Sequence, residues 1–301
     1  DWLYQMVDER SGHAPNIGAN DGACLLGLNS ASYRDFRPSV QLAAAVFRDA
    51  RAYDSHVAGE SLAWLGIPIP SNHLAARTSR VFPDGGWVTI HARDRRSWAC
   101  LRFPVYRFRP SHADSLHMDL WHDGDNVLRD GGSCGYAVGE PWHDYFPGTA
   151  SHNTVQFDGR DQMPRIGRFL YGAWPVCTDV GAIVGTASST HWSASYRDAR
   201  RCEHDRTVNE ENGVWTITDT VRGFRDSAVL RWRLRPGNYQ REARGVGGAG
   251  IHLHFRDARG PQMKLVEAWE SHRYHEMTAL PVLEVSLGPE VTRVITEIRF
   301  S

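Results

Sequence analysis

Two histidines and one aspartate between residues 112 and 152 give this sequence its clearest capacity for chemistry. His112, Asp130 and His152 carry imidazole nitrogens and a carboxylate, which are the ligands that zinc takes where cysteine is not offered. Three such ligands leave a fourth coordination position open. Because the chain contains 15 histidines, a second interpretation stays open, in which both histidines are hydrogen-bonded core residues that tie loops together.

A β-hairpin and one further strand are expected to bring these three side chains together. Residues 116–120 alternate apolar and polar side chains, as in a strand with one packed face. Asp123-Gly124 is a turn signal, and the returning strand is expected at 127–130. His152 leads into a third strand at 155–157. The hairpin would place the His112 end of the first strand near Asp130.

The period of the apolar residues changes near residue 80. The first 80 residues show helical spacing, with Pro38 in the first turn of the clearest helix. From residue 81 a period of two, with turn signals between short runs, predicts an antiparallel β-sandwich. We therefore expect an α+β multidomain chain, helical over 1–80 and β over 81–301. Because the chain starts at Asp1 in amphipathic sequence, we also expect the complete protein to begin earlier.

Composition and charge exclude some classes of partner. The net charge of -1 gives no overall field that would select nucleic acid or an anionic membrane, and no apolar run approaches the length of a membrane span. Five scattered cysteines argue against a disulfide framework. The cations are arginines except for Lys264, which suits carboxylate or sulfate recognition but also a GC-rich genome. Arg231, Arg233 and Arg235 are expected on a solvated strand face, or else as a cationic stripe that meets a polyanion.

The sequence around the three candidate ligands resembles the heparinase II/III family. These proteins are polysaccharide lyases with an α/α toroid followed by a layered antiparallel β-sandwich. The resemblance covers most of the chain in layout and is specific between about residues 107 and 162. The motifs that carry it are Arg-Pro-Ser-His-Ala-Asp at 109–114, Leu-Arg-Asp-Gly-Gly at 128–132 followed by Tyr136, Thr-Ala-Ser-His-Asn-Thr-Val at 149–155, Asp-Gly-Arg-Asp-Gln at 158–162 and the loop at 15–22.

The resemblance implies a fold, a reaction and a metal. Residues 1–80 would be the C-terminal part of the toroid, and 81–301 the heparinase II/III-like β-sandwich. The reaction would be β-elimination at a uronic acid in an acidic bacterial or glycosaminoglycan-type polysaccharide. One structural zinc, held by His112, Asp130 and His152, would fix the floor of the sugar cleft. The same resemblance favours a periplasmic or cell-envelope location.

One position departs from the family pattern. Pro110 stands where the family's catalytic histidine lies, two residues before the first metal ligand, and the family's catalytic tyrosine lies upstream of this chain. The nearest substitutes are His117 and Tyr136. His117 would point from its strand toward the cleft, or else lie on an exposed face. Tyr136 would contact the sugar in the cleft, or else pack in the core.

Four further polar residues are expected around the cleft, and a fifth near the metal. Asn20 and Asp21 would reach it from the helical side, and Arg160 and Gln162 would form its rim, as substrate-binding residues. Simple turn roles are the alternative for all four. Asn153 would cap backbone groups or support a metal ligand.

Three functions are compatible with these observations. The first is a polysaccharide lyase, an enzyme that breaks carbon–oxygen bonds in an acidic polysaccharide. The second is a non-catalytic carbohydrate-binding or polysaccharide-assembly protein. The third is a zinc-dependent hydrolase, in which the open metal position activates water. The sequence also leaves room for a homo-oligomer.

Overall fold

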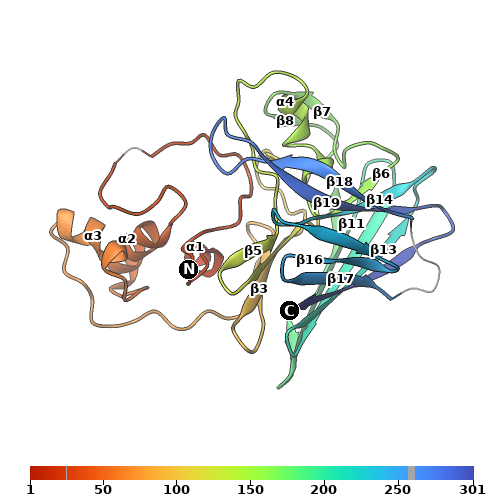
Figure 1. Cartoon of the computed structure of the whole chain (residues 1–301). Helices are drawn as coiled ribbons and strands as arrows, with labels where there is room; N and C mark the ends of the chain where they lie inside the picture. The colour runs from red at the N-terminus through yellow and green to blue at the C-terminus, as the bar shows by residue number, and fades with distance from the viewer. Residues whose placement is uncertain (25, 257–261) are drawn as a thin grey trace.

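The computed structural model describes residues 1–24, 26–256 and 262–301. Antiparallel sheets dominate the regular secondary structure, and three short helices precede the first strand (Figure 1). The antiparallel β architecture expected from residue 81 onward is therefore confirmed, with strands beginning at Arg80.

The helices are α1 (Trp2–Met6), α2 (Arg37–Arg48) and α3 (His56–Trp64). Pro38 lies in the first turn of α2, as predicted, where its missing N–H costs no hydrogen bond. The helix ends at Asp49, which adopts a left-handed conformation, and the N–H of the next residue, Ala50, donates to the Ala44 carbonyl over 3.3 Å. Val40 of α2 and Ala58 of α3 pack into one small apolar cluster.

A five-stranded sheet lies beside these helices and is buried on both faces. Val88, Leu101 and Leu120 on one face join the main core, whereas Trp98 and Trp121 on the other stack against each other and pack around Met6 of α1. Helix α1 therefore shares an apolar cluster with the β part. The strands run in the order β1 (Arg80–Phe82), β2 (Trp87–His91), β3 (Ser97–Arg102), β4 (Met118–His122) and β5 (Asp125–Leu128).

Two further sheets, of nine and four strands, contribute most of the main core. Strands β10 to β13, β20 and β17 to β15 run side by side in that order, with β9 pairing β11 outside this path; β18, β19, β14 and β6 form the other sheet. Trp192, Trp215 and Trp232 are fully buried in this core. The strands are β9 (Val176–Val180), β10 (Val184–Gly185), β11 (Ser189–Arg197), β12 (Glu203–Glu211), β13 (Val214–Arg222), β14 (Ala228–Arg233), β15 (Tyr239–Glu242), β16 (Gly245–Gly248), β17 (Ile251–Phe255), β18 (Gln262–Glu270), β19 (Thr278–Leu287) and β20 (Arg293–Phe300).

The predicted hairpin and third strand are present. β4 and β5 pair antiparallel around Asp123 and Gly124, which both have positive φ, as a tight hairpin turn requires. The third strand, β6 (Val155–Phe157), pairs with β14 rather than with the hairpin. The backbone N–H of Arg129 donates to the Arg233 carbonyl, which brings the end of β5 beside β14 and therefore beside β6.

The chain between β5 and β9 contains several short elements. Helix α4 (Trp142–Tyr145) and the 3-10 turn η1 (Thr149–Ser151) precede β6, and the short hairpin β7 (Arg165–Gly167) and β8 (Leu170–Tyr171) follows it. In the residues that the structure describes, no helix has the length and apolar character needed to cross a bilayer.

Candidate metal centre and adjoining cavity

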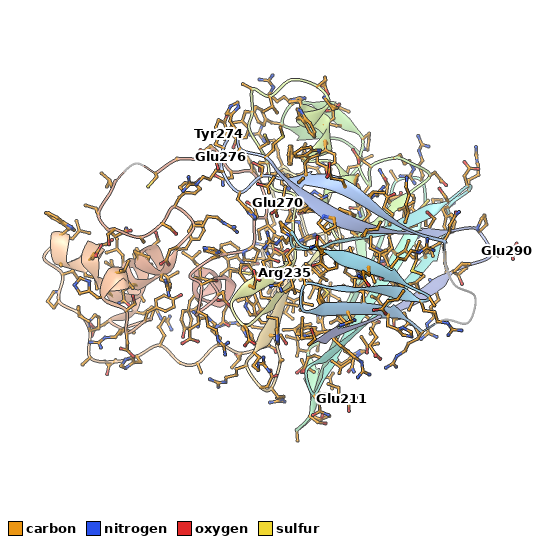
Figure 2. All side chains as sticks on the ribbon, in the orientation of Figure 1. Glu211, Arg235, Glu270, Tyr274, Glu276 and Glu290 are labelled. Carbon is orange, nitrogen blue, oxygen red and sulfur yellow. The ribbon has the colours of Figure 1, made fainter. Side chains whose placement is uncertain are left out.

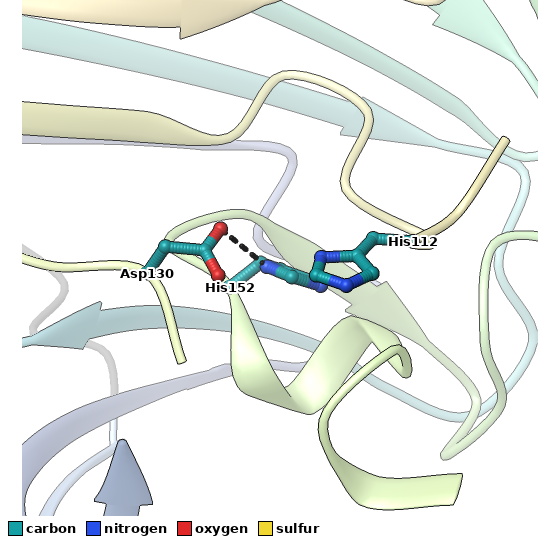
Figure 3. A group of neighbouring side chains, drawn as sticks. All are labelled: His112, Asp130 and His152. Atoms are coloured by element: carbon teal, nitrogen blue, oxygen red, sulfur yellow. Dashed lines mark hydrogen bonds and ion pairs between the residues drawn. The ribbon is translucent and has the colours of Figure 1, made fainter. Parts of the chain in front are cut away.

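The structure places the three predicted ligands together, inside the protein. One ligand atom from each of His112, Asp130 and His152 lies within 4.8 Å of the other two (Figure 3). The exposed fractions are 3% for His112 and 0% for Asp130 and His152. Asp130 follows β5 and His152 follows η1, while His112 lies in the segment between β3 and β4.

Backbone hydrogen bonds hold these three segments in place. The N–H of Gly131 donates to the Ser151 carbonyl over 2.9 Å, which joins the residues next to Asp130 and His152. A Cβ atom on Gly131 would lie 2.0 Å from the Ser151 hydroxyl, so only glycine allows this approach. The N–H of Ala113 donates to the Pro147 carbonyl and fixes the segment that carries His112.

The donor atoms of the triad fit a divalent cation. His152 Nδ1 lies 2.8 Å from Asp130 Oδ2, and Asp130 Oδ1 accepts the Gly132 N–H over 2.7 Å. Within the described ranges, the buried His112 Nδ1 and His152 Nε2 atoms have no hydrogen-bond partner. A buried nitrogen without a partner costs free energy, and a bound cation would remove that cost.

Charge and burial prepare the triad for a cation. Burial alone would raise the pKa of Asp130, but the adjacent His152 and His117 hold it below its usual range. Burial and the neighbouring His152 lower the pKa of His112 to about 4. Asp130 is therefore charged and His112 neutral at pH 7, and these are the states in which the two side chains bind metals.

Asn153 connects the segments behind the triad, as predicted for a residue that caps backbone groups. Its side-chain amide donates to the carbonyls of Met118 and Arg129, and its side-chain oxygen accepts the Arg233 N–H over 2.6 Å. Asn153 is fully buried. One side chain therefore ties β4, the end of β5 and β14 to the residue after His152.

His117 is buried rather than exposed, so both placements predicted for it are wrong. Its exposed fraction is 0%, and it lines neither of the two cavities next to the triad. The second face of its sheet is covered, and for that reason the polar side of the alternation does not meet solvent. Its imidazole lies behind Asp130, with Nε2 3.4 Å from Asp130 Oδ2.

A cavity of about 280 Å³ adjoins the triad and has His112 in its wall. It is cationic, because three arginines line it and no carboxylate does among the residues that the structure describes. The guanidinium of Arg165 contacts Asp144 and His143, whereas neither Arg109 nor Arg168 has an ion-pair partner in the described chain. The lining residues are Ala19, Phe108, Arg109, Pro110, Ser111, His112, Ser133, Gly135, Tyr136, His143, Pro147, Arg165, Arg168 and Phe169.

A second cavity of about 260 Å³ shares residues 108–112 with the first, so this segment lines both. Arg109 therefore borders both spaces, with its guanidinium 5.3 Å from the Phe108 ring centre. Pro110 also lines both and brings no titratable group to either. Unpaired arginine beside aromatic rings suits a ligand made of sugar rings that carry carboxylate or sulfate groups.

Tyr136 lines the first cavity, which agrees with a cleft position rather than a core one. Its ring packs edge-on against Phe169 and Tyr274, and its backbone N–H donates to the Tyr274 hydroxyl. Tyr274, labelled in Figure 2, comes from the turn between β18 and β19. Partial burial, followed by the negative charge of Asp21, raises the pKa of the Tyr136 phenol, which therefore stays protonated at pH 7.

None of the four residues predicted to bind substrate lines the cavity. Asn20 and Asp21 lie near the cavity, but their carboxamide and carboxylate oxygens accept backbone N–H groups of Gly22 and Ala23, as in simple turns. For Arg160 and Gln162 the rim prediction is wrong. Arg160 pairs with buried Asp198 at 2.6 Å. Gln162 is 2% exposed and is hydrogen-bonded to the backbone of Ser115, so a ligand cannot reach it.

Sequence reasoning missed the cations of the cavity. Arg109 is the first residue of the Arg-Pro-Ser-His-Ala-Asp motif at 109–114. Arg168 lies in the turn of the β7–β8 hairpin, next to Phe169. The available signal was an arginine beside a phenylalanine in two segments that flank the triad, at Phe108-Arg109 and Arg168-Phe169. Sequence spacing does not show that the two segments face one cavity.

Comparison with known proteins gives one matching family and several solved structures with a similar fold. The model of a family described as heparinase II/III-like, C-terminal, matches residues 75–294. Among curated proteins, none matches this chain. The first solved structures that resemble it are more than twice as long, so the chain spans less than half of their length.

Three of these structures share the fold at low sequence identity. A heparinase III structure has a TM-score of 0.73 at 16% identity, covering 99% of this chain and 45% of its own. The heparan sulfate lyase HepC from Pedobacter heparinus has 0.72 at 14%, with 98% and 45% covered. Another heparinase III has 0.71 at 11%, with 99% and 47% covered.

Proposed function

This chain belongs to the heparinase II/III-like family, and on that premise we propose that it forms part of a polysaccharide lyase that acts on an acidic, uronate-containing polysaccharide. The observation that carries the proposal is the cavity beside the triad. It offers Arg109 and Arg168 without ion-pair partners in the described chain, next to the rings of Phe108, Tyr136 and Phe169.

The cavity suits the chemical difficulty of β-elimination. A base takes the proton at C5 of the uronate, a role that would fall to the family's catalytic tyrosine, which the resemblance places upstream of this chain. As the C4–O bond then breaks, negative charge builds up on the adjacent carboxylate. Fixed cations lower the free energy of that charge most effectively in a site shielded from water. Arg109 and Arg168 would neutralise the carboxylate, and the protonated hydroxyl of Tyr136 would give a proton to the departing oxygen.

We also propose one zinc ion at the triad, held by His112, Asp130 and His152. The support is chemical, since two imidazoles and a carboxylate are a common zinc donor set, and two buried nitrogens of this set have no partner among the described residues. The ligands come from three separate segments, so the ion would hold the cavity wall in shape and stabilise the local fold.

The test uses the full-length protein, loaded with zinc, and a panel of uronate polymers. We expect the ultraviolet absorbance of an unsaturated uronate to rise with time. Tyr136→Phe should lower turnover about 100-fold or more and leave polymer binding close to wild type, because only the proton donor is lost. The absence of product from every uronate polymer would refute lyase activity, and a fully active Tyr136→Phe would refute the role of Tyr136.

A second function, carbohydrate binding without catalysis, is favoured by Pro110. The cavity has no imidazole at the position of the family's catalytic histidine, and the buried His117 does not replace it. In that case the full-length protein would bind a uronate polymer tightly and release no unsaturated product. Binding and turnover measured on the same polymer separate the two functions.

A further inference from the structure

We propose that His117 is a positioning residue, which holds the Asp130 carboxylate for the metal from within the core. The proposal rests on the zinc site proposed above. Three observations carry it: the hydrogen bond that His117 accepts, the direction of its other ring nitrogen, and the burial of every group involved.

The hydrogen bond on one side of the ring fixes where its proton lies. His117 Nδ1 is 2.9 Å from the backbone nitrogen of Asn153. A backbone N–H can only donate, so Nδ1 is the acceptor and carries no proton. Nε2 is then the protonated nitrogen. A protonated nitrogen has no lone pair for a metal, so His117 is not a fourth ligand, although it lies beside the triad.

The protonated nitrogen points between two carboxylates. His117 Nε2 lies 3.4 Å from Asp130 Oδ2 and 3.6 Å from Asp119 Oδ1, and all three side chains are fully buried. These distances exceed those of a good hydrogen bond, so the contact is electrostatic. Burial makes such an attraction stronger than it would be at the surface.

Asp130 is held from several directions at once. Its Oδ1 atom accepts the Gly132 N–H, and its Oδ2 atom faces both His152 and His117. The His117 ring is itself fixed, because Asn153 lies next to the ligand His152 and is tied to β4 and β5 by its side chain. Removing a group that orients a metal ligand in this way typically lowers metal affinity about 10- to 100-fold.

Two substitutions distinguish the contribution of Nε2 from that of Nδ1. His117→Gln can keep a donor near the place of Nε2, whereas His117→Asn can keep an acceptor near the place of Nδ1 but offers no donor toward Asp130. We expect zinc affinity, measured by competition with a chromophoric chelator, to fall about 10-fold or more in His117→Asn. His117→Gln should stay within about threefold of wild type. The visible spectrum of bound cobalt should change in His117→Asn and stay close to wild type in His117→Gln.

The control is Val208→Ala, which removes buried volume from β12 and leaves the triad and His117 untouched. It should lower the stability to urea and leave zinc affinity unchanged. His117→Leu, which fills the space without any donor, replaces His117→Asn if the latter does not fold. Wild type that binds no zinc would refute the metal site and this proposal with it. Wild type that binds zinc no better than His117→Asn, or a loss in Val208→Ala equal to that in His117→Asn, would refute only the positioning role.

Discussion

Arg109 and Arg168 are exposed cations that reach one cavity from two separate segments of the chain. The structure gives Arg165, the third arginine of the cavity, an acidic neighbour in Asp144, so its charge is already balanced. The two exposed arginines are not balanced in this way within the described residues. Their charge is available to a ligand, which makes them the residues that would distinguish an acidic sugar from a neutral one.

We predict that Arg168→Ala weakens the binding of an acidic oligosaccharide about tenfold, because one charge-assisted hydrogen bond is lost. Binding of a neutral oligosaccharide of the same length should not change. Isothermal titration calorimetry measures both, and the acidic affinity should fall as salt rises. Arg241→Ala is the matched control, since it removes an exposed arginine on β15, remote from the lining of the cavity. Equal losses in both variants would contradict the prediction.

At the scale of elements, β12 and β13 anchor the segments next to the triad through buried charged side chains. Arg206 of β12 is fully buried, and its guanidinium contacts Asp219 of β13 at 2.7 Å. The same guanidinium donates to the carbonyls of Leu116 and Asn153. His204 completes the network with Nε2 2.7 Å from Asp219. The loops that carry the metal ligands are therefore anchored to the large sheet by a buried ionic network.

Asp219→Asn should destabilise the protein by about 3–5 kcal/mol, because it leaves the buried Arg206 without its counter-charge. Urea unfolding at pH 7 measures this loss. Asp205→Asn, which removes the carboxylate of a surface pair with Arg222, should cost less than about 1 kcal/mol. A similar loss in the two variants would show that the buried network does not contribute as argued.

The same network makes stability depend on acid. Burial opposes ionisation of Asp219, but Arg206 and His204 outweigh it and hold the pKa of Asp219 below its ordinary value. A carboxyl whose pKa is lower in the folded than in the unfolded state stabilises the fold above about pH 4, and that contribution disappears as the pH falls through the folded pKa. Asp219→Asn should therefore lose less stability than wild type between pH 7 and about pH 3.

Much of the element layout was predictable from the sequence, because a period of two and turn residues determine strands locally. The hairpin at Asp123 and Gly124 and the strand β6 follow from such signals. His117 and Arg233 were misplaced for one physical reason. Alternation predicts a solvated second face, but His117 is covered by Asn153 and Asp130, and Arg233 is buried with its guanidinium on Tyr145 and the Trp269 carbonyl.

At the scale of the whole molecule, the N-terminal segment and the β part are joined at the candidate site. Asn16 donates to the Ser271 carbonyl, and Ser133 donates to the Gly18 carbonyl. Ala19 lines the cavity. The sequence showed that the metal ligands could meet, since one hairpin and one strand suffice. It could not show the cavity, because the cavity forms where segments from both ends of the chain meet.

The metal should therefore stabilise the molecule as a whole. Its three ligands come from segments that meet only in the folded chain, so zinc binds the native state and shifts unfolding by mass action. A zinc concentration 100-fold above the dissociation constant should add about 2.7 kcal/mol to the free energy of unfolding. Differential scanning calorimetry should show a higher melting temperature with zinc and a lower one after chelation. His152→Ala should fold with a melting temperature that zinc does not change, because one ligand is gone. Wild-type protein that melts at the same temperature with zinc and with chelator would contradict a structural role for the ion.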